Sequence, residues 1–401
     1  MNRKHFIFAA AAATLTLAAP AWAQKQYDPG ADDKEIRIGA IHPYSGPASA
    51  YGAIGKAIGA YFAKVNDEGG INGRKIKYIP LDDGYNPAKT LEMARKLVEE
   101  DEALLVFNTL GTAPNAAIQK YLNQNKVPQL FVASGASRWG DPKHFPWTMG
   151  WQPSYPSEAR IFAAHILETK PGARIAVLYQ NDDYGRDYLR GFEEGLGEKA
   201  KTMIVAKVSY EVTDPSVDSQ MLSLKASGAD TFFNVTTPKF AALAIRKAAE
   251  IGWKPTQYLN SVSASVGSVL TPAGPDNAVG IYTASYQKDP TDPQFQKGKD
   301  WDDWLAWMKK YHPGGDLKDV NNVYGYHAAQ GLVQVLRQCG DKLTRENVMK
   351  QAASLDLPTL PMLLPGINVK TGADDYFPFE RQMLSRFDGK TWVLQGKVYG
   401  R

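Results

Sequence analysis

The chain has 401 residues, with 46 basic and 42 acidic side chains and a formal net charge of +4 at pH 7. The charges are scattered, and no basic run is interleaved with aromatic residues, which argues against nucleic acid as a partner. Aromatic residues make up 11% of the chain, a share that excludes a disordered protein, and the length favours two domains.

The first 23 residues have the three parts of a cleavable export signal. Arg3 and Lys4 precede an apolar run over residues 6–19, and the segment Ala21 to Ala23 fits the small-x-small rule for cleavage. The run is shorter than the roughly 20 residues that span a bilayer, which disfavours a membrane anchor. The single cysteine, Cys339, lies far from the cleavage site, so neither a lipid anchor nor an internal disulfide is expected. We therefore expect a soluble periplasmic protein that its core alone stabilises.

From residue 35 onward, apolar segments of strand length alternate with segments of helical period. The expected strands are residues 35–41, 75–81, 103–107 and 129–133. The expected helices between them are residues 48–66, 86–100 and 114–124. This alternation predicts a parallel sheet with helices on both faces, joined by right-handed crossovers.

A segment rich in proline and aromatic residues, 142–156, interrupts the alternation, which then resumes. The next expected helices are 157–168, 185–197, 216–227 and 239–252, and the strands are 174–179, 203–210, 231–235 and 257–260. Two longer helices, 295–311 and 321–338, follow, and a hairpin that turns at Asp388 and Gly389 closes the chain.

These segments predict an α/β fold of two doubly wound, Rossmann-like lobes, joined by a three-crossover hinge, with the ligand cleft between the lobes. The expected parts are a signal peptide (1–23), the first part of lobe 1 (35–150), lobe 2 (153–279), the return to lobe 1 (280–357), and the third crossover with a C-terminal segment at least partly in lobe 2 (358–401).

Motifs for catalysis are missing from the sequence. It contains no Gly-x-Ser-x-Gly, His-Glu-x-x-His or Walker A motif, and no Gly-x-Gly-x-x-Gly after a strand. The six histidines lack metal-ligand spacing, so we expect no catalytic residue, no metal and no cofactor. The pairs Asp82-Asp83 and Asp182-Asp183 are interpreted as caps of the following turns and helices rather than as paired acids.

Short motifs that follow one another in order carry a resemblance to a known family. They are Ile36 to Ala40, Ser45 to Pro47 with Tyr51-Gly52, Asn66 to Arg74, Asp82-Asp83 with Asn86 to Lys89, Asp182 to Gly185, and Asp214 with Ser219. Each alone also serves as a cap or a turn, but together they cover residues 35–280. With these motifs the chain resembles the leucine/isoleucine/valine-binding family of periplasmic receptors for ABC importers.

The resemblance implies a type I periplasmic binding fold whose two lobes close on a solute, after which the closed form docks on a membrane permease. It implies no chemistry on the solute, and we expect a monomer. A different class with the same fold, a sensing module that docks on a signalling receptor, stays open.

In the branched-chain amino acid receptors of this family, a serine and a threonine hold the ligand's charged end, an acidic residue pairs the ammonium, and tyrosines cover the ligand. The resemblance carries these roles onto particular positions and their neighbours. They are Tyr51, Tyr184 and Thr236 for the tyrosines, Gly111 and Thr112 for the serine, Ser134, Gly135, Ala136 and Ser137 for the threonine, and Val262 and Ser263 for the acid.

At Val262 and Ser263, the positions that correspond to the acid, this sequence departs from the family's pattern, and the departure bears on the nature of the solute. No acidic residue lies between Gln257 and Pro275, and an ammonium in a closed cleft without a counter-charge would lose its hydration. A carboxylate from elsewhere in the chain, such as Asp183, stays open as a counter-charge. Backbone N–H groups at a helix N-terminus would instead favour an anion. We expect Trp139, Trp147 and Trp151 near the cleft rim or hinge, where their faces would favour a flat ligand.

The sequence therefore predicts capture of a small carboxylate, an aromatic acid of the benzoate or hydroxycinnamate type. The loop that holds these tryptophans resembles receptors associated with aromatic-acid uptake. Aliphatic acids, amides and branched-chain amino acids remain as alternative solutes.

Overall fold

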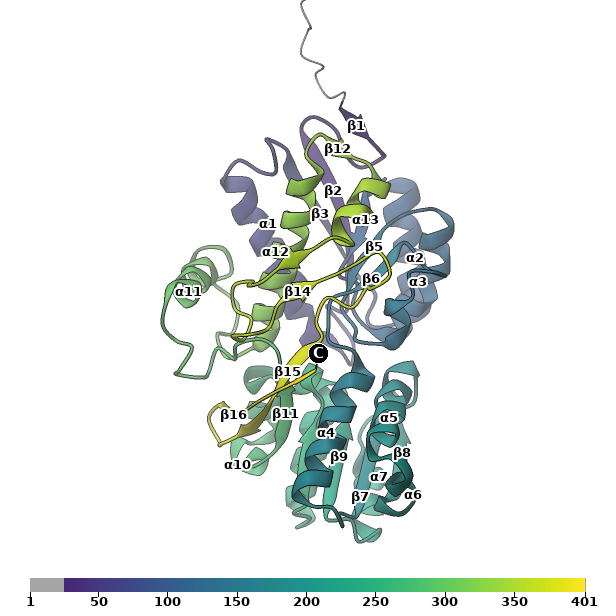
Figure 1. Ribbon diagram of the computed structural model, residues 1–401, viewed down its shortest axis with the longest axis vertical. Helices are drawn as coiled ribbons and strands as arrows, with labels where there is room; N and C mark the ends of the chain where they lie inside the picture. Colours follow the sequence, from purple (N-terminus) through teal and green to yellow (C-terminus); the bar gives the residue numbers. More distant parts are fainter. Residues whose placement is uncertain (1–24, 401) are drawn as a thin grey trace, which may run out of the picture.

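Strands and helices that alternate along the chain build two parallel sheets, each covered by helices on both faces (Figure 1). The computed structural model describes residues 25–400, so the expected signal peptide lies outside the described residues. The first sheet, that of lobe 1, is parallel throughout. Its strands in spatial order are β3 (Lys75–Asp82), β2 (Glu35–His42), β4 (Leu105–Phe107), β5 (Gln129–Val132) and β6 (Thr148–Gly150).

The second sheet, that of lobe 2, has seven strands, and its β15 runs antiparallel to both neighbours. In spatial order the strands are β16 (Trp392–Gly400), β15 (Arg381–Phe387), β11 (Tyr282–Ser285), β10 (Thr256–Leu259), β9 (Thr231–Val235), β7 (Ile175–Gln180) and β8 (Ile204–Tyr210). The hairpin predicted at the end of the chain is thus the antiparallel edge of this sheet.

Helices sandwich each sheet. In lobe 1, α1 packs on α12 on one face, while α2 packs on α3 on the other. The helices of lobe 1 are α1 (Gly52–Asp67), α2 (Pro87–Arg95), α3 (Thr112–Gln124), α11 (Lys299–Tyr311), α12 (Val320–Cys339) and α13 (Arg345–Ala352). Those of lobe 2 are α4 (Tyr155–Thr169), α5 (Asp183–Leu196), α6 (Ala200–Met203), α7 (Asp218–Ala226), α8 (Pro238–Glu250), α9 (Thr271–Ala273) and α10 (Pro275–Ala278). The two doubly wound lobes predicted from the sequence are therefore present.

The chain passes between the sheets three times, at positions that differ in part from the expected ones. The first passage follows β6, as predicted near residue 150. The second comes after Ser285 rather than near residue 280, because β11 pairs with β10 inside the sheet of lobe 2. The third comes just before β15 rather than near residue 358, because Leu363 and Val369 are still buried in the core of lobe 1.

Four short strands finish lobe 1, and the sequence predicted none of them. β1 (Gln26–Tyr27) pairs with β12 (Lys342–Leu343), and β13 (Asp356–Leu357) pairs with β14 (Val369–Lys370). Cys339, at the end of α12, is buried in the core of lobe 1, as its apolar surroundings predicted. Over residues 25–400, none of the helices combines the length and the apolar composition that a membrane crossing requires.

Candidate functional site

The carboxyl ends of the two sheets enclose a cavity between the lobes. Tyr51 and Thr112 of lobe 1 line it together with Tyr184 and Val262 of lobe 2. A water molecule can reach about 70 Å³ of it, which is space for roughly five waters at ~10–15 Å³ each. Ligands of doubly wound folds bind at this edge of the sheet, so the cavity is the candidate binding site.

Aromatic rings dominate the cavity wall, and each is at most 6% exposed. They are Tyr51, Tyr85, Tyr155, Tyr184, Tyr286, Tyr324 and Trp392. The ring of Tyr155 meets the edge of Tyr184 at 5.3 Å and stacks on Tyr188 at 4.5 Å, which fixes its orientation. Burial raises the pKa of Tyr155 to about 12, so its hydroxyl is neutral at pH 7. The tyrosine hydroxyls are thus neutral polar groups on the aromatic part of the wall.

The N-terminus of α3 forms one side of the wall. Gly111 precedes this helix with φ of +96° and provides no side-chain cap, so N–H groups of the first turn are free to receive an anion. The hydroxyl oxygens of Thr112 and Ser134 lie 2.7 Å apart, and Trp139 donates to Ser134 at 2.9 Å. A Cβ on residue 111 would lie 2.4 Å from the ring of Tyr85, so only glycine fits there.

The cavity wall contains Asp289 but no lysine or arginine. Burial raises the pKa of Asp289 to about 6, which still leaves most of the carboxyl groups ionised at pH 7. Sequence reasoning missed this residue because the resemblance placed the acid within residues 260–265. The absence of an acid near Val262 therefore does not leave the cavity without a carboxylate, and that argument against an ammonium solute is wrong.

A second buried carboxylate, Glu158 of α4, lies behind the wall rather than in it. It accepts hydrogen bonds from the Ser261 amide at 2.7 Å, the Ser261 hydroxyl at 2.5 Å and Gln382 at 3.2 Å. These bonds fix the turn that carries Ser261 and Val262 into the cavity. Glu158 is thereby occupied by the protein itself.

The eleven candidates from the sequence divide into three groups. Tyr51, Gly111, Thr112, Tyr184 and Val262 line the cavity. Ser134, Gly135, Thr236 and Ser263 lie outside this lining. Ser134 pairs with Thr112, Ser263 donates to the carbonyl of Thr236, and a Cβ on Gly135 would lie 2.7 Å from the ring of Tyr155. Ala136 and Ser137 line an outer groove between the lobes instead.

The three tryptophans expected near the rim or hinge do not face the cavity. Trp151 packs on Phe131 at 4.1 Å and donates to His327 at 3.1 Å, and Trp139 bonds to Ser134. Flat surfaces for a ligand come from the tyrosines and from Trp392. Those residues mostly follow strands or crossovers, and no local pattern distinguishes them from core tyrosines.

Three of the four paired aspartates, Asp82, Asp83 and Asp182, accept hydrogen bonds from backbone amides, as predicted, whereas Asp183 pairs with Arg138 and Arg186. Asp82 accepts hydrogen bonds from the amides of Tyr44 and Gly84 at 2.9 and 3.0 Å. Asp182 accepts one from the amide of Gly185 at 3.2 Å in the first turn of α5. Their oxygens are engaged with the backbone, which is the structural role that the sequence indicated.

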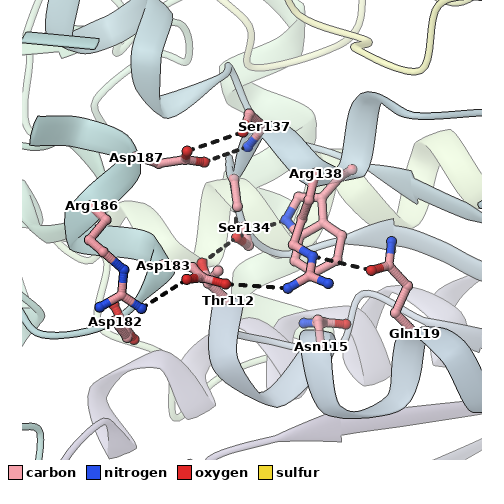
Figure 2. A network of polar contacts seen from close by, with 12 residues as sticks. Thr112, Asn115, Gln119, Ser134, Ser137, Arg138, Asp182, Asp183, Arg186 and Asp187 are labelled. Atoms are coloured by element: carbon pink, nitrogen blue, oxygen red, sulfur yellow. Dashed lines mark hydrogen bonds and ion pairs between the residues drawn. The ribbon is translucent and has the colours of Figure 1, made fainter. Parts of the chain in front are cut away.

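A polar clasp, defined by Ser137, Arg138, Asp183, Asp187 and Arg190, joins the lobes at the rim. Figure 2 labels its members except Arg190. Asp187 of α5 accepts from the amide of Ser137 at 2.6 Å and from its hydroxyl at 3.1 Å. Arg190 donates to the same hydroxyl at 2.9 Å, and Arg138 lies 3.3 Å from Asp183. Deeper inside, Tyr51 donates across the cleft to the carbonyl of Val262 at 3.0 Å. The structure is thus a closed form.

Replacing Asp187 with alanine is expected to weaken binding of every solute by about three- to tenfold. The side chain is 15% exposed, and its hydrogen bonds to Ser137 exist only when the lobes are closed, so their loss of about 1 kcal/mol acts on the closed form. Calorimetric titration measures the affinity. Glu194→Ala is the matched control, because Glu194 pairs with Arg160 inside lobe 2. Equal affinities for wild type and Asp187→Ala would contradict the clasp's role in closure.

Two lobes that close over a small aromatic-walled cavity define a receptor for a small solute. The chain belongs to the type I periplasmic binding proteins of the Leu/Ile/Val-binding family. The family model, described as periplasmic binding protein, matches residues 35–378. Like the other members of its family, this chain is a periplasmic binding protein rather than an enzyme.

Relatives and solved structures agree with this assignment. Leu/Ile/Val-binding protein homolog 7 of Brucella suis is 26% identical over 357 residues, which cover 84% of this chain and 82% of the relative. A branched-chain amino acid ABC transporter protein of Thermus thermophilus with bound valine is 17% identical, with a TM-score of 0.81 over 92% of this chain and 97% of that one. A solute-binding protein of R. palustris in complex with 4-hydroxybenzoate is 18% identical, with a TM-score of 0.76 over 92% and 97%. At these identities the two structures show the fold alone.

Proposed function

We propose that this protein captures a small aromatic carboxylate, of the benzoate or hydroxycinnamate type, in the periplasm. The lobes close over the solute, and the closed monomer delivers it to the membrane permease of an ABC importer. The observation that carries the proposal is a cavity walled by seven aromatic rings with the uncapped N-terminus of α3 in its wall.

Both ends of such a solute have a complement in the cavity. The ring gains by leaving water for a wall of tyrosine faces and edges. The carboxylate gains from the N–H groups and the dipole of α3, together with the Thr112 hydroxyl. A space of about 70 Å³ suits a single ring or a short side chain and is small for a long acyl chain.

A branched-chain amino acid is the second candidate solute, and Asp289 is the observation that favours it. Its carboxylate lines the cavity and could pair an ammonium group. The valine held by the Thermus structure is in line with this alternative.

A thermal-shift screen of the mature protein tests the proposal, since a ligand that binds only the folded state raises the melting temperature. The panel contains benzoate, 4-hydroxybenzoate, cinnamate, leucine, valine and urea. We expect shifts with the aromatic acids and none with leucine or valine. Shifts with leucine or valine alone would overturn the proposed solute class.

Thr112→Val is expected to weaken binding of an aromatic carboxylate by about three- to tenfold. The change removes the hydroxyl beside the α3 N-terminus at nearly constant volume, a loss of about 1 kcal/mol. Calorimetric titration gives the affinity, and chemical denaturation reports the stability. Thr109→Val is the control, because the buried hydroxyl of Thr109 has no hydrogen-bond partner and lies outside the cavity wall. If both variants bind like wild type, the carboxylate does not lie at α3.

A further inference from the structure

Asp289 lies on the segment that leads from β11 back to lobe 1. Only one of its two carboxylate oxygens accepts hydrogen bonds from the described residues. Oδ1 accepts from the amide of Thr291 at 2.8 Å and from the hydroxyl of Thr291. Over residues 25–400, no group donates a hydrogen bond to Oδ2. Because Asp289 lines the cavity, this second oxygen is available to a solute.

Among residues 25–400, no salt bridge joins Asp289 to a cation. The nearby charges that act on it are the acidic groups of Asp292 and of Asp319, at the start of α12. The adjacent Lys288 is paired with Asp300. A carboxylate in a mostly apolar wall without a cation is costly, and such groups gather where a ligand is recognised.

Asp289 and the α3 N-terminus lie toward different sides of the cavity. Asp289 is near the start of α12, whose Val320 and Asn321 also line the wall. Helix α12 packs with α1 on one face of the lobe 1 sheet, while α3 packs with α2 on the other (Figure 1). The two polar groups thus lie beside helices that cover opposite faces of the lobe 1 sheet.

We propose that Asp289 accepts a hydrogen bond from a hydroxyl group on the ring of the solute, at the end remote from its carboxylate. This inference rests on the proposed function and narrows it to hydroxylated aromatic acids. An α-amino acid carries its ammonium and its carboxylate on one carbon. A para-hydroxylated aromatic acid has its two polar groups separated by the ring.

The test compares three ligands that differ at one position: 4-hydroxybenzoate, 4-methoxybenzoate and benzoate. Their affinities are measured by calorimetry for the mature wild-type protein, for Asp289→Asn and for Asp292→Asn. The methoxy group fills the same space but cannot donate a hydrogen bond. A hydrogen bond to a charged acceptor predicts that wild type binds 4-hydroxybenzoate about ten- to a hundredfold more tightly than 4-methoxybenzoate.

Asp289→Asn keeps an acceptor for Thr291 and removes the charge. The preference for 4-hydroxybenzoate over 4-methoxybenzoate should therefore fall at least tenfold. Asp292→Asn is the matched control: Asp292 lies on the same segment, its carboxylate accepts from the amide of Gln294 at 2.9 Å, and it does not line the cavity. The preference should survive in this variant. Melting temperatures establish that both variants are folded.

Equal binding of the hydroxy and methoxy acids by wild type would overturn the role of Asp289 and leave the proposed solute class standing. A preference that persists in Asp289→Asn would also overturn it. Binding of leucine with no binding of any aromatic acid would overturn both the inference and the proposed function.

Discussion

Asp289→Asn is expected to raise the free energy of unfolding of the ligand-free protein at pH 7 by about 1–3 kcal/mol. Burial displaces the pKa of this carboxyl from 3.8 to about 6 in the folded protein. At full ionisation that displacement corresponds to roughly 3 kcal/mol against folding, an upper bound because water in the cavity reduces it. Asparagine keeps the acceptor for Thr291 and does not ionise. The variant should therefore gain stability while it loses affinity for its solute, as binding-site residues often do.

The stability difference between wild type and Asp289→Asn should depend on pH, and the two pKa values of Asp289 give its sign. Below the unfolded pKa near 3.8, Asp289 is neutral in both states and costs nothing. As the pH rises from about 4 to 6, the unfolded chain releases its proton more readily than the folded protein, so the wild type loses stability that the variant keeps. The difference between the two should grow over this interval and stay constant above it.

Urea denaturation of both proteins at a series of pH values from 4 to 8 measures this difference. Asp292→Asn is again the control: it removes one repulsive neighbour but leaves the Asp289 carboxyl buried, and because burial is the larger cause the gain should be smaller than in Asp289→Asn. A pH-independent difference, or a variant less stable than wild type at pH 7, would mean that Asp289 is well solvated in the ligand-free protein.

The order of strands and helices could be predicted because their signals are local. β2, β3 and β9 occupy the segments that alternation and apolar runs indicated, and α12 follows its helical period. β6 was missed because it lies inside the segment rich in proline and aromatic residues, 142–156, and β11 was missed because its residues, Tyr-Thr-Ala-Ser, form no apolar run. The error in the second passage between the lobes follows from the missed β11.

The cavity was predictable only where the chain enters it beside a recognisable motif. Tyr51 and Tyr184 stand in short motifs that follow strands β2 and β7, and both line the cavity. Tyr286 and Asp289 reach it from a crossover whose position depends on the tertiary fold, and a sequence without that fold gives no reason to join them to Tyr51.

Gly111→Ala is expected to lower the free energy of unfolding by about 2–5 kcal/mol and to weaken solute binding by two orders of magnitude or more. Residue 111 has φ of +96° and ψ of 150°, a region open almost only to glycine, and forcing alanine into it costs about 1–3 kcal/mol. The added Cβ would also lie 2.4 Å from the ring of Tyr85 and 3.2 Å from Pro114. Relief of this overlap must move Tyr85 or the start of α3, at about 1–3 kcal/mol more.

Gly69→Ala separates the two causes of the expected loss, backbone strain and steric overlap of the added methyl group. Gly69 has φ of +104°, but nothing lies within 4 Å of its added Cβ, and the residue is remote from the cavity wall. This control should lose only the stability that backbone strain removes, and its affinity for the solute should match that of wild type. Denaturation and calorimetry on the two variants together measure both quantities. If Gly111→Ala bound its solute as tightly as Gly69→Ala does, neither Tyr85 nor the α3 N-terminus could be holding the ligand, because both must shift to admit the methyl group.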